Sequence, residues 1–249
     1  MHESSIAQLS TRVEIIRAHF QSYYEALDLA AADDVAQILY PDWRNPLEKP
    51  FLWLGDLHPY LFTNLLRSFL DDEDEEDEID PFPDLGNRVF SRKINNGSDS
   101  DDEIFKRPWH IVTAWRNPSE NLMNRIEQIE CGVRLMVPAL ASRSRKAQAG
   151  FVGTLAEYWG SGGGGGGRRK EAAKMVVGKA LAGEMDEMVG VFVDANRLRR
   201  SVLTEIIGAT SVYQAAMFLE ALAQFLVGFR DSDLVSEFER CKMPMEKVT

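Results

Sequence analysis

The chain has 249 residues, and 45% of them are hydrophobic, which is enough to bury one substantial core or two small ones. Its 2 cysteines, Cys131 and Cys241, lie far apart and exclude a disulfide framework or a CxxC-type metal site. No apolar stretch has the length of a membrane-spanning helix, and the first residues lack the layout of a signal peptide. We therefore expect a protein that begins in a reducing cytosol.

The formal net charge of −11 comes from one segment. Residues 71–103 hold 14 acidic and three basic side chains, which leaves 25 acidic and 25 basic residues for the rest of the chain. A nucleic-acid-binding surface needs a clustered basic excess. The balanced remainder therefore predicts no direct binding to DNA or RNA.

The first element is a predicted helix whose apolar residues alternate at intervals of three and four. These residues are Ile6, Leu9, Val13, Ile16, Phe20, Tyr23 and Leu27. The pattern stops after about four heptads, which favours a core-facing helix over a coiled-coil seam.

A second helix start is predicted at Asn45, where Pro46 suits the first turn and Glu48 completes a capping box. A short aromatic turn follows, and helical spacing resumes over residues 57–69. We predict that the large aromatic side chains around this turn are buried anchors between the first helix and the next pair. They are Trp43, Phe51 and Trp53.

Two segments are predicted to lack regular structure. Residues 71–105 begin with eight consecutive acids and are poor in apolar side chains, so burial cannot compensate the cost of ordering them. Residues 160–167 form a glycine-rich loop, either natural or an engineered linker. It does not fit a phosphate-binding loop, because Arg168 and Arg169 stand where Lys and Ser or Thr would follow.

The second half of the chain is again helical in pattern. A helix is expected to start near Asn117 and to bend or end at Pro138, before a short helix over residues 151–159. Two further helices follow, the first ending near Gly208 and the second opening with a capping box at residues 211–214.

The predicted fold class is therefore all-α, a single helical-bundle domain with a long acidic disordered insert and a glycine-rich loop. Residues 1–70 and 106–240 form the domain, residues 71–105 the insert, and residues 241–249 a tail.

No pattern in the sequence indicates catalysis. The four histidines fall in different segments, and neither HExxH nor GxSxG occurs. Carboxylate pairs such as Glu25 and Asp28 are typical of a solvated helix face. We predict no enzymatic activity, no cofactor and no metal.

Three basic clusters are the better functional candidates. They are Arg143, Arg145 and Lys146; Arg168, Arg169, Lys170, Lys174 and Lys179; and Arg197, Arg199 and Arg200. Apolar residues such as Met175 and Leu181 interrupt the middle cluster, as in helices that bind membrane surfaces or calmodulin. A solvated helix face is the other interpretation.

The aromatic segment over residues 51–55, preceded by Trp43 and Pro46, resembles the signature of the plant DELAY OF GERMINATION domain. This domain also follows the leucine zipper of TGA transcription factors. Tyr23 and Tyr24 resemble its aromatic-rich first helix, and residues 194–199 and 212–219 resemble its two C-terminal helices.

The resemblance implies a function through protein partners. No basic zipper precedes Ile6, so DNA binding is not implied, and residues 225–229 offer no histidine for haem. The acidic insert makes the chain most similar to family members that specify pollen apertures at plasma-membrane domains. We therefore expect a non-enzymatic adaptor that is cytoplasmic and peripheral at the plasma membrane.

Alternatives stay open at this point. They are a nuclear transcription-linked cofactor and, third, an unrecognised enzyme. A homodimer, calmodulin and anionic lipid are further partners that the patterns leave open.

Overall fold

The computed structural model describes residues 2–70, 114–160 and 167–241. The predicted acidic insert, most of the glycine run and almost all of the tail lie outside these residues. The elements are α1 (His2–Leu39), η1 (Lys49–Phe51), β1 (Leu52–Trp53), β2 (Asp56–Leu57), α2 (Tyr60–Arg67), α5 (Glu120–Gly160), α6 (Gly167–Ala209), α7 (Val212–Gly228) and α8 (Ser232–Arg240). The predicted all-α fold is confirmed.

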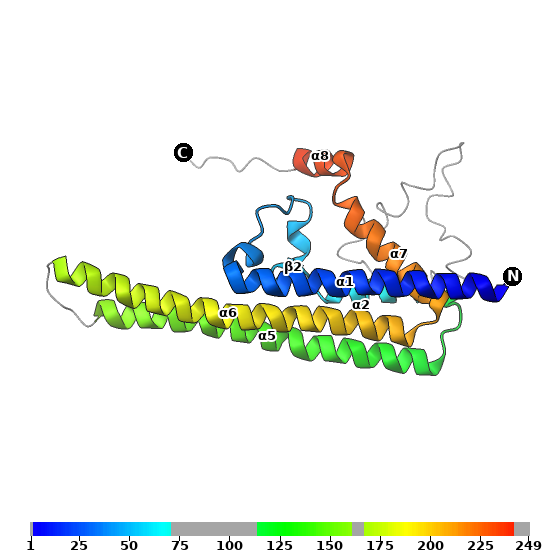
Figure 1. The fold of residues 1–249 in the computed structure, drawn as a ribbon, viewed down its shortest axis with the longest axis horizontal. Helices are drawn as coiled ribbons and strands as arrows, with labels where there is room; N and C mark the ends of the chain where they lie inside the picture. The colour runs from blue at the N-terminus through cyan, green and yellow to red at the C-terminus, as the bar shows by residue number, and fades with distance from the viewer. Residues whose placement is uncertain (1, 71–113, 161–166, 242–249) are drawn as a thin grey trace.

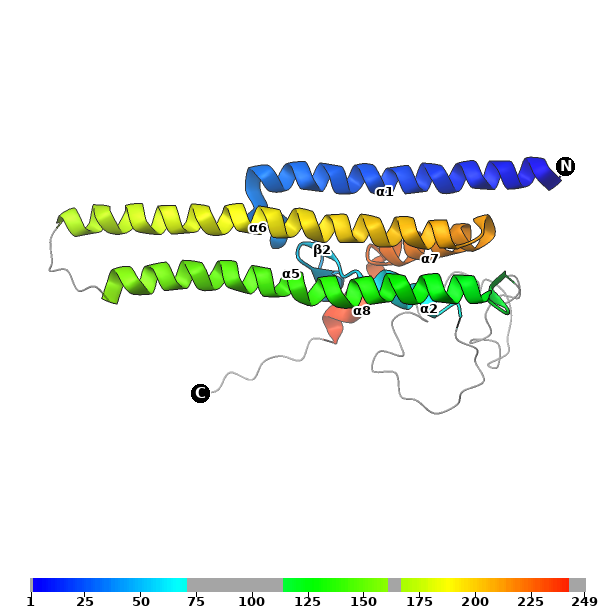
Figure 2. The same cartoon turned by 90° about the horizontal axis from the view of Figure 1, so that it is seen from below.

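Helices α1, α6 and α5 lie side by side as one layer, with α6 in the middle (Figure 2). Helices α2 and α7 pack against one face of this layer together with the β1–β2 hairpin. Helices α5 and α6 continue past the C-terminal end of α1 (Figure 1). We call this projecting part, residues 145–160 and 167–184, the arm.

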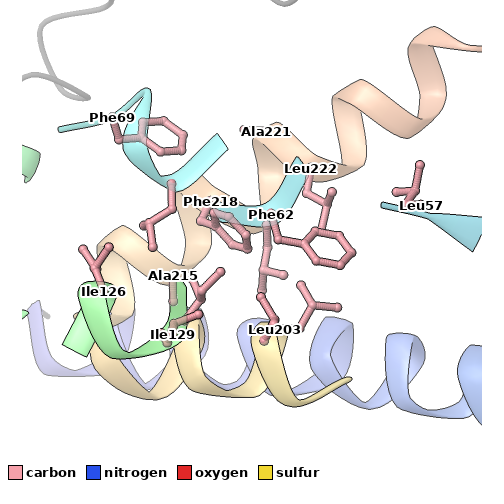
Figure 3. Close-up of a cluster of buried hydrophobic side chains, with 14 of the residues drawn as sticks. Leu57, Phe62, Phe69, Ile126, Ile129, Leu203, Ala215, Phe218, Ala221 and Leu222 are labelled. Carbon is pink, nitrogen blue, oxygen red and sulfur yellow. The ribbon is translucent and has the colours of Figure 1, made fainter. Parts of the chain in front are cut away.

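The core lies where α2 and α7 meet the layer (Figure 3). Phe218 and Leu222 of α7 contact a cluster that includes Phe62 of α2, Ile126 of α5 and Leu203 of α6. The predicted capping box is present, since the Ser211 hydroxyl accepts from the Gln214 backbone and the Gln214 side chain accepts from Ser211 N–H. Helix α8, which the sequence patterns did not indicate, begins at an Asp231 cap.

The buried stripe of α1 differs from the predicted one. Val13 is buried as expected, but Ile16 is exposed, and Tyr24 and Ala31 are among the most buried residues. A straight helix has 3.6 residues per turn, so a repeat of strictly seven residues drifts around its surface. The buried residues of α1 are therefore spaced by the 3.6-residue helical period, and they depart from the seven-residue repeat.

The predicted helix at Asn45 does not form. The Asn45 side chain accepts from the Glu48 backbone at 3.0 Å, but the Glu48 carboxylate pairs with Arg44 and leaves the capping box half made. A 3-10 turn and a two-residue hairpin follow instead. Leu54 and Gly55 both have positive φ, 46° and 82°, as a type I′ turn requires.

Helix α5 does not end at Pro138 and absorbs the separate short helix expected over residues 151–159. Pro138 is exposed, and its helix packs against α6 along most of its length. The proline ring removes one backbone hydrogen bond, and the packing against α6 keeps the chain helical where that bond is missing. The helix is capped by Ser119, whose hydroxyl accepts from Leu122 N–H at 3.2 Å.

Within the described residues, no single helix has the length and hydropathy to cross a bilayer. Helices α7 and α8, bent by 57°, meet these criteria only when they are taken as a pair.

Candidate functional site

A buried arginine holds the hairpin against the helical layer. The Arg199 side chain of α6 is fully buried. Its Nε donates to the Leu57 carbonyl at 2.7 Å, and its Nη2 donates to the carbonyls of Trp53 and, at 3.2 Å, Asp56. Its Nη1 donates to the Asn196 side chain at 2.7 Å. One planar guanidinium therefore bonds to several hairpin carbonyls at once, including that of Leu57, which does not pair across the hairpin.

Asp56 links this hairpin to α1. Its buried carboxylate accepts from the Tyr23 hydroxyl and, at 2.9 Å, from Arg44 Nη2. Burial, with the Asp56 carboxylate second, raises the pKa of Tyr23 and Tyr24 above the ordinary tyrosine value. Both phenols therefore stay protonated, and the Tyr23 hydroxyl stays a hydrogen-bond donor.

A second polar contact joins α1 to α6. Asp28 accepts from Asn196 Nδ2 at 2.7 Å and from Arg200 Nη2 at 3.1 Å. With Arg199 buried and Arg200 paired to α1, the predicted basic cluster at residues 197–200 is not a surface patch. Only Arg197 is exposed, and its guanidinium lies 2.6 Å from Asp194.

The first basic cluster is also partly neutralised. Arg143 forms ion pairs with Glu187 at 2.7 Å and Asp194 at 2.5 Å. Arg145 and Lys146 are exposed.

The predicted anchors have different environments. Phe51 is half-buried against Phe225 and Phe229 of α7, with ring centroids 5.4 and 5.3 Å away. Trp53 is half-buried and lies 5.7 Å from the Arg199 guanidinium. Trp43 is 59% exposed, so the prediction that it is buried is wrong. The turn directs Pro41 inward and leaves the indole at the surface.

The middle basic cluster lies on the arm. Lys174 and Lys179 are exposed, while the side chains of Arg168, Arg169 and Lys170 lie outside the described part of the chain. The same helix exposes Met175 and Leu181.

The other arm helix, α5, exposes Val152 and Trp159. These two residues are seven apart, so they lie on one side of the helix. We call Val152, Trp159, Lys174, Met175, Lys179 and Leu181 the arm surface.

A shallow groove of about 300 Å³ lies between α5 and α6. Val133, Met136 and Val202 line it, and so do Arg125 and Glu205, which form an ion pair of 2.5 Å. Its charged groups are paired with each other, whereas a small-molecule site offers convergent polar groups to its ligand. Within the described ranges, no group of three or more His, Cys, Asp or Glu side chains is placed to hold a metal ion.

Comparison with known proteins shows the family of this chain. A family model described as seed dormancy control matches residues 1–68, which include α1, the hairpin and α2. The chain is 44% identical over 252 residues to Protein INAPERTURATE POLLEN1 of Arabidopsis thaliana, covering 97% of this chain and 85% of that protein. The chain belongs to the INAPERTURATE POLLEN1 family. The resemblance to the DELAY OF GERMINATION domain is thereby confirmed.

Two other relatives define the extent of the match. The INAPERTURATE POLLEN 1 homolog of Oryza sativa subsp. japonica is 32% identical over 228 residues, or 91% of this chain and 70% of that protein. Transcription factor TGA2.1 of the same species is 35% identical over 68 residues, or 27% of this chain and 20% of that protein. Similarity to the transcription factor is therefore partial.

Proposed function

We propose that this protein is a pollen aperture factor and that it acts as a non-enzymatic adaptor, bringing partner proteins to domains of the plasma membrane. The observation that carries the proposal is 44% identity over 97% of the chain to a protein named for inaperturate pollen. A match of this extent includes the arm and the C-terminal helices, beyond the 68 residues of the family model.

The distribution of polar groups supports an adaptor role. The buried polar side chains of the hairpin region, Asp56, Asn196 and Arg199, all make hydrogen bonds that hold elements together. The projecting arm exposes apolar and basic side chains together, those of the arm surface. Such a surface is available to partners without disturbing the core.

The arm surface has the chemistry of a peripheral membrane contact. Trp159 offers an amphipathic ring, and Lys174 and Lys179 offer charge, to a headgroup layer. Each basic side chain near an anionic bilayer contributes about 1 kcal/mol, so the five residues of the middle cluster would bind weakly and in a salt-sensitive manner. Partner proteins would then supply specificity.

The decisive test of function is complementation in a plant that lacks its own aperture factor. The full chain, fused to a fluorescent protein, should restore apertures and concentrate in patches at the cell cortex. The partial match to the TGA factors motivates the nuclear cofactor as second candidate. Exclusively nuclear signal with restored apertures would favour that cofactor, and unrestored pollen would reject the aperture role.

Membrane contact is tested separately by co-sedimentation with anionic and neutral liposomes at low and high salt. Changing Arg168, Arg169, Lys170, Lys174 and Lys179 to Gln should abolish binding to anionic vesicles. A control with Arg145, Lys146 and Arg197 changed to Gln removes exposed charge outside the cluster and should bind like wild type. Equal binding by both variants, or none by wild type, would leave cortical recruitment to protein partners alone.

A further inference from the structure

The outward side of α1 carries apolar residues that the fold does not use. Helix α1 forms one edge of the three-helix layer, and its inner side packs against α6 and α7 (Figure 2). On the opposite side, Ile15 is 62% and Leu29 is 74% exposed. Both residues lie about half a turn from the buried Val13 and Ala31, in the middle of the outward face.

Residues of similar character lie at equal distances before and after Ser22 on this outward face. Ile15 and Leu29 lie seven residues before and after it, and the small residues Ala18 and Ala26 lie four residues before and after. All of them are exposed. Two copies of the face, aligned antiparallel about Ser22, would place Ile15 of one copy against Leu29 of the other.

Two residues of opposite charge lie at nearly equal distances on either side of Ser22. Arg12 lies ten residues before Ser22 and Asp33 lies eleven residues after it, and both lie to the same side of the line of residues that runs through Ile15, Ser22 and Leu29. Both are exposed, and neither makes an ion pair with another described residue. In the antiparallel arrangement each Arg12 meets Asp33 of the second copy. A parallel arrangement would bring like charges together at both positions.

We propose that this face of α1, from Thr11 to Asp33, binds a second copy of the chain in an antiparallel, two-fold symmetric dimer. The small side chains Ala18, Ser22 and Ala26 allow the two helix axes to approach to about 8 Å. The seam is roughly 33 Å long, from 1.5 Å of rise per residue. It ends one residue before the kink in α1 at Asp34, which has non-helical φ and ψ.

A single helix pair is a small interface, so we expect dissociation in the micromolar range. Sedimentation of the full chain from about 1 to 100 µM should show a reversible monomer–dimer equilibrium. Ile15→Asp or Leu29→Asp should raise Kd about tenfold or more, because each change removes two symmetric apolar contacts. A monomer at every concentration would overturn the proposal.

Charge reversal tests the register. Arg12→Asp and Asp33→Arg should each raise Kd by about threefold or more, and the double variant should return Kd close to the wild-type value. Arg145→Asp changes an exposed charge on α5, outside the proposed interface, and should leave Kd unaltered. Absence of rescue in the double variant would reject this pairing. Unchanged thermal midpoints would show that the altered residues do not act through folding.

Disulfide trapping tests the direction of the helices. The background carries Cys131→Ser and Cys241→Ser, because both native cysteines are exposed. A mixture of Ile15→Cys and Leu29→Cys chains should form the mixed disulfide faster than either homodisulfide, and Ser22→Cys should link to itself. Preferred self-linking of Ile15→Cys would show a parallel pair and overturn the antiparallel interface.

Discussion

Arg199→Met removes the guanidinium that fastens the hairpin to α6 while keeping an unbranched side chain of similar reach. The carbonyls of Leu57 and Leu54 lose their donor, and so does the Asn196 side chain. The buried Asp56 carboxylate also loses one of its two nearby positive charges. The fold then keeps several buried acceptors without partners.

Each buried acceptor without a donor costs about 1–3 kcal/mol. Removing the desolvated guanidinium recovers part of that cost, so the net loss of unfolding free energy should be about 3–5 kcal/mol. Arg199→Lys retains the charge but lacks the planar fork that reaches several carbonyls at once. We expect it to lose about 2 kcal/mol.

Urea unfolding followed by far-UV circular dichroism measures these losses. Arg197→Met is the matched control, because its side chain lies on the same helix, is 70% exposed and pairs only with Asp194 among the described residues. It should lose less than about 0.5 kcal/mol. A loss below about 1 kcal/mol for Arg199→Met would mean that water replaces the guanidinium, and would refute the idea that Arg199 anchors the hairpin.

Three comparisons test other features by the same unfolding measurement. Gly55→Ala should cost about 2–4 kcal/mol, because φ is 82° and a Cβ would lie 2.5 Å from the Ile38 carbonyl oxygen. Gly132→Ala, which adds a Cβ in open space on α5, should stabilise the protein by about 0.5–1 kcal/mol. Similar effects of the two substitutions would contradict the strain at Gly55. Phe51→Ala should cost about 1–3 kcal/mol and the exposed Trp43→Ala less than about 0.5 kcal/mol, and the reverse order would restore Trp43 as an anchor. Burial, and then the charge of Arg199, lower the pKa of His58 in the folded protein. The stability that neutral His58 contributes is therefore complete above about pH 6.5 and is lost as the pH falls through the lowered folded pKa. Wild type should lose stability on acidification more steeply than His58→Asn, and parallel curves would contradict this.

Local signals predicted the elements that depend on neighbours in the chain. The capping box at Ser211 forms, and α6 ends one residue after the stop signal at Gly208, because both depend on groups within one helical turn. The signals at Asn45 and Pro138 are of the same kind, but tertiary contacts override them. Arg44 takes the Glu48 carboxylate, and α6 supports α5 through the proline.

Arg199 shows what sequence reasoning missed. The sequence places it in a cluster with Arg197 and Arg200, because its backbone acceptors lie 142 to 146 residues away in the chain. A signal was nevertheless present. Position 199 lies three residues after Asn196 and four before Leu203, on the core side of α6. A charged residue in phase with a buried face indicates a buried partner network.

The shape of the molecule would couple the proposed α1 interface to the arm surface. Both lie in one layer, with the arm beyond the C-terminal end of α1 (Figure 2). A two-fold axis perpendicular to this layer would point the two arms in opposite directions and turn equivalent faces to the same side. One flat bilayer would then meet two arm surfaces, and the second contact would form at high effective concentration. Because five basic residues would bind only weakly in a monomer, pairing through α1 would determine whether the arms hold the protein at a membrane. Arg12→Asp, which leaves both arms intact, should then reduce binding to anionic vesicles, and adding Asp33→Arg should restore it.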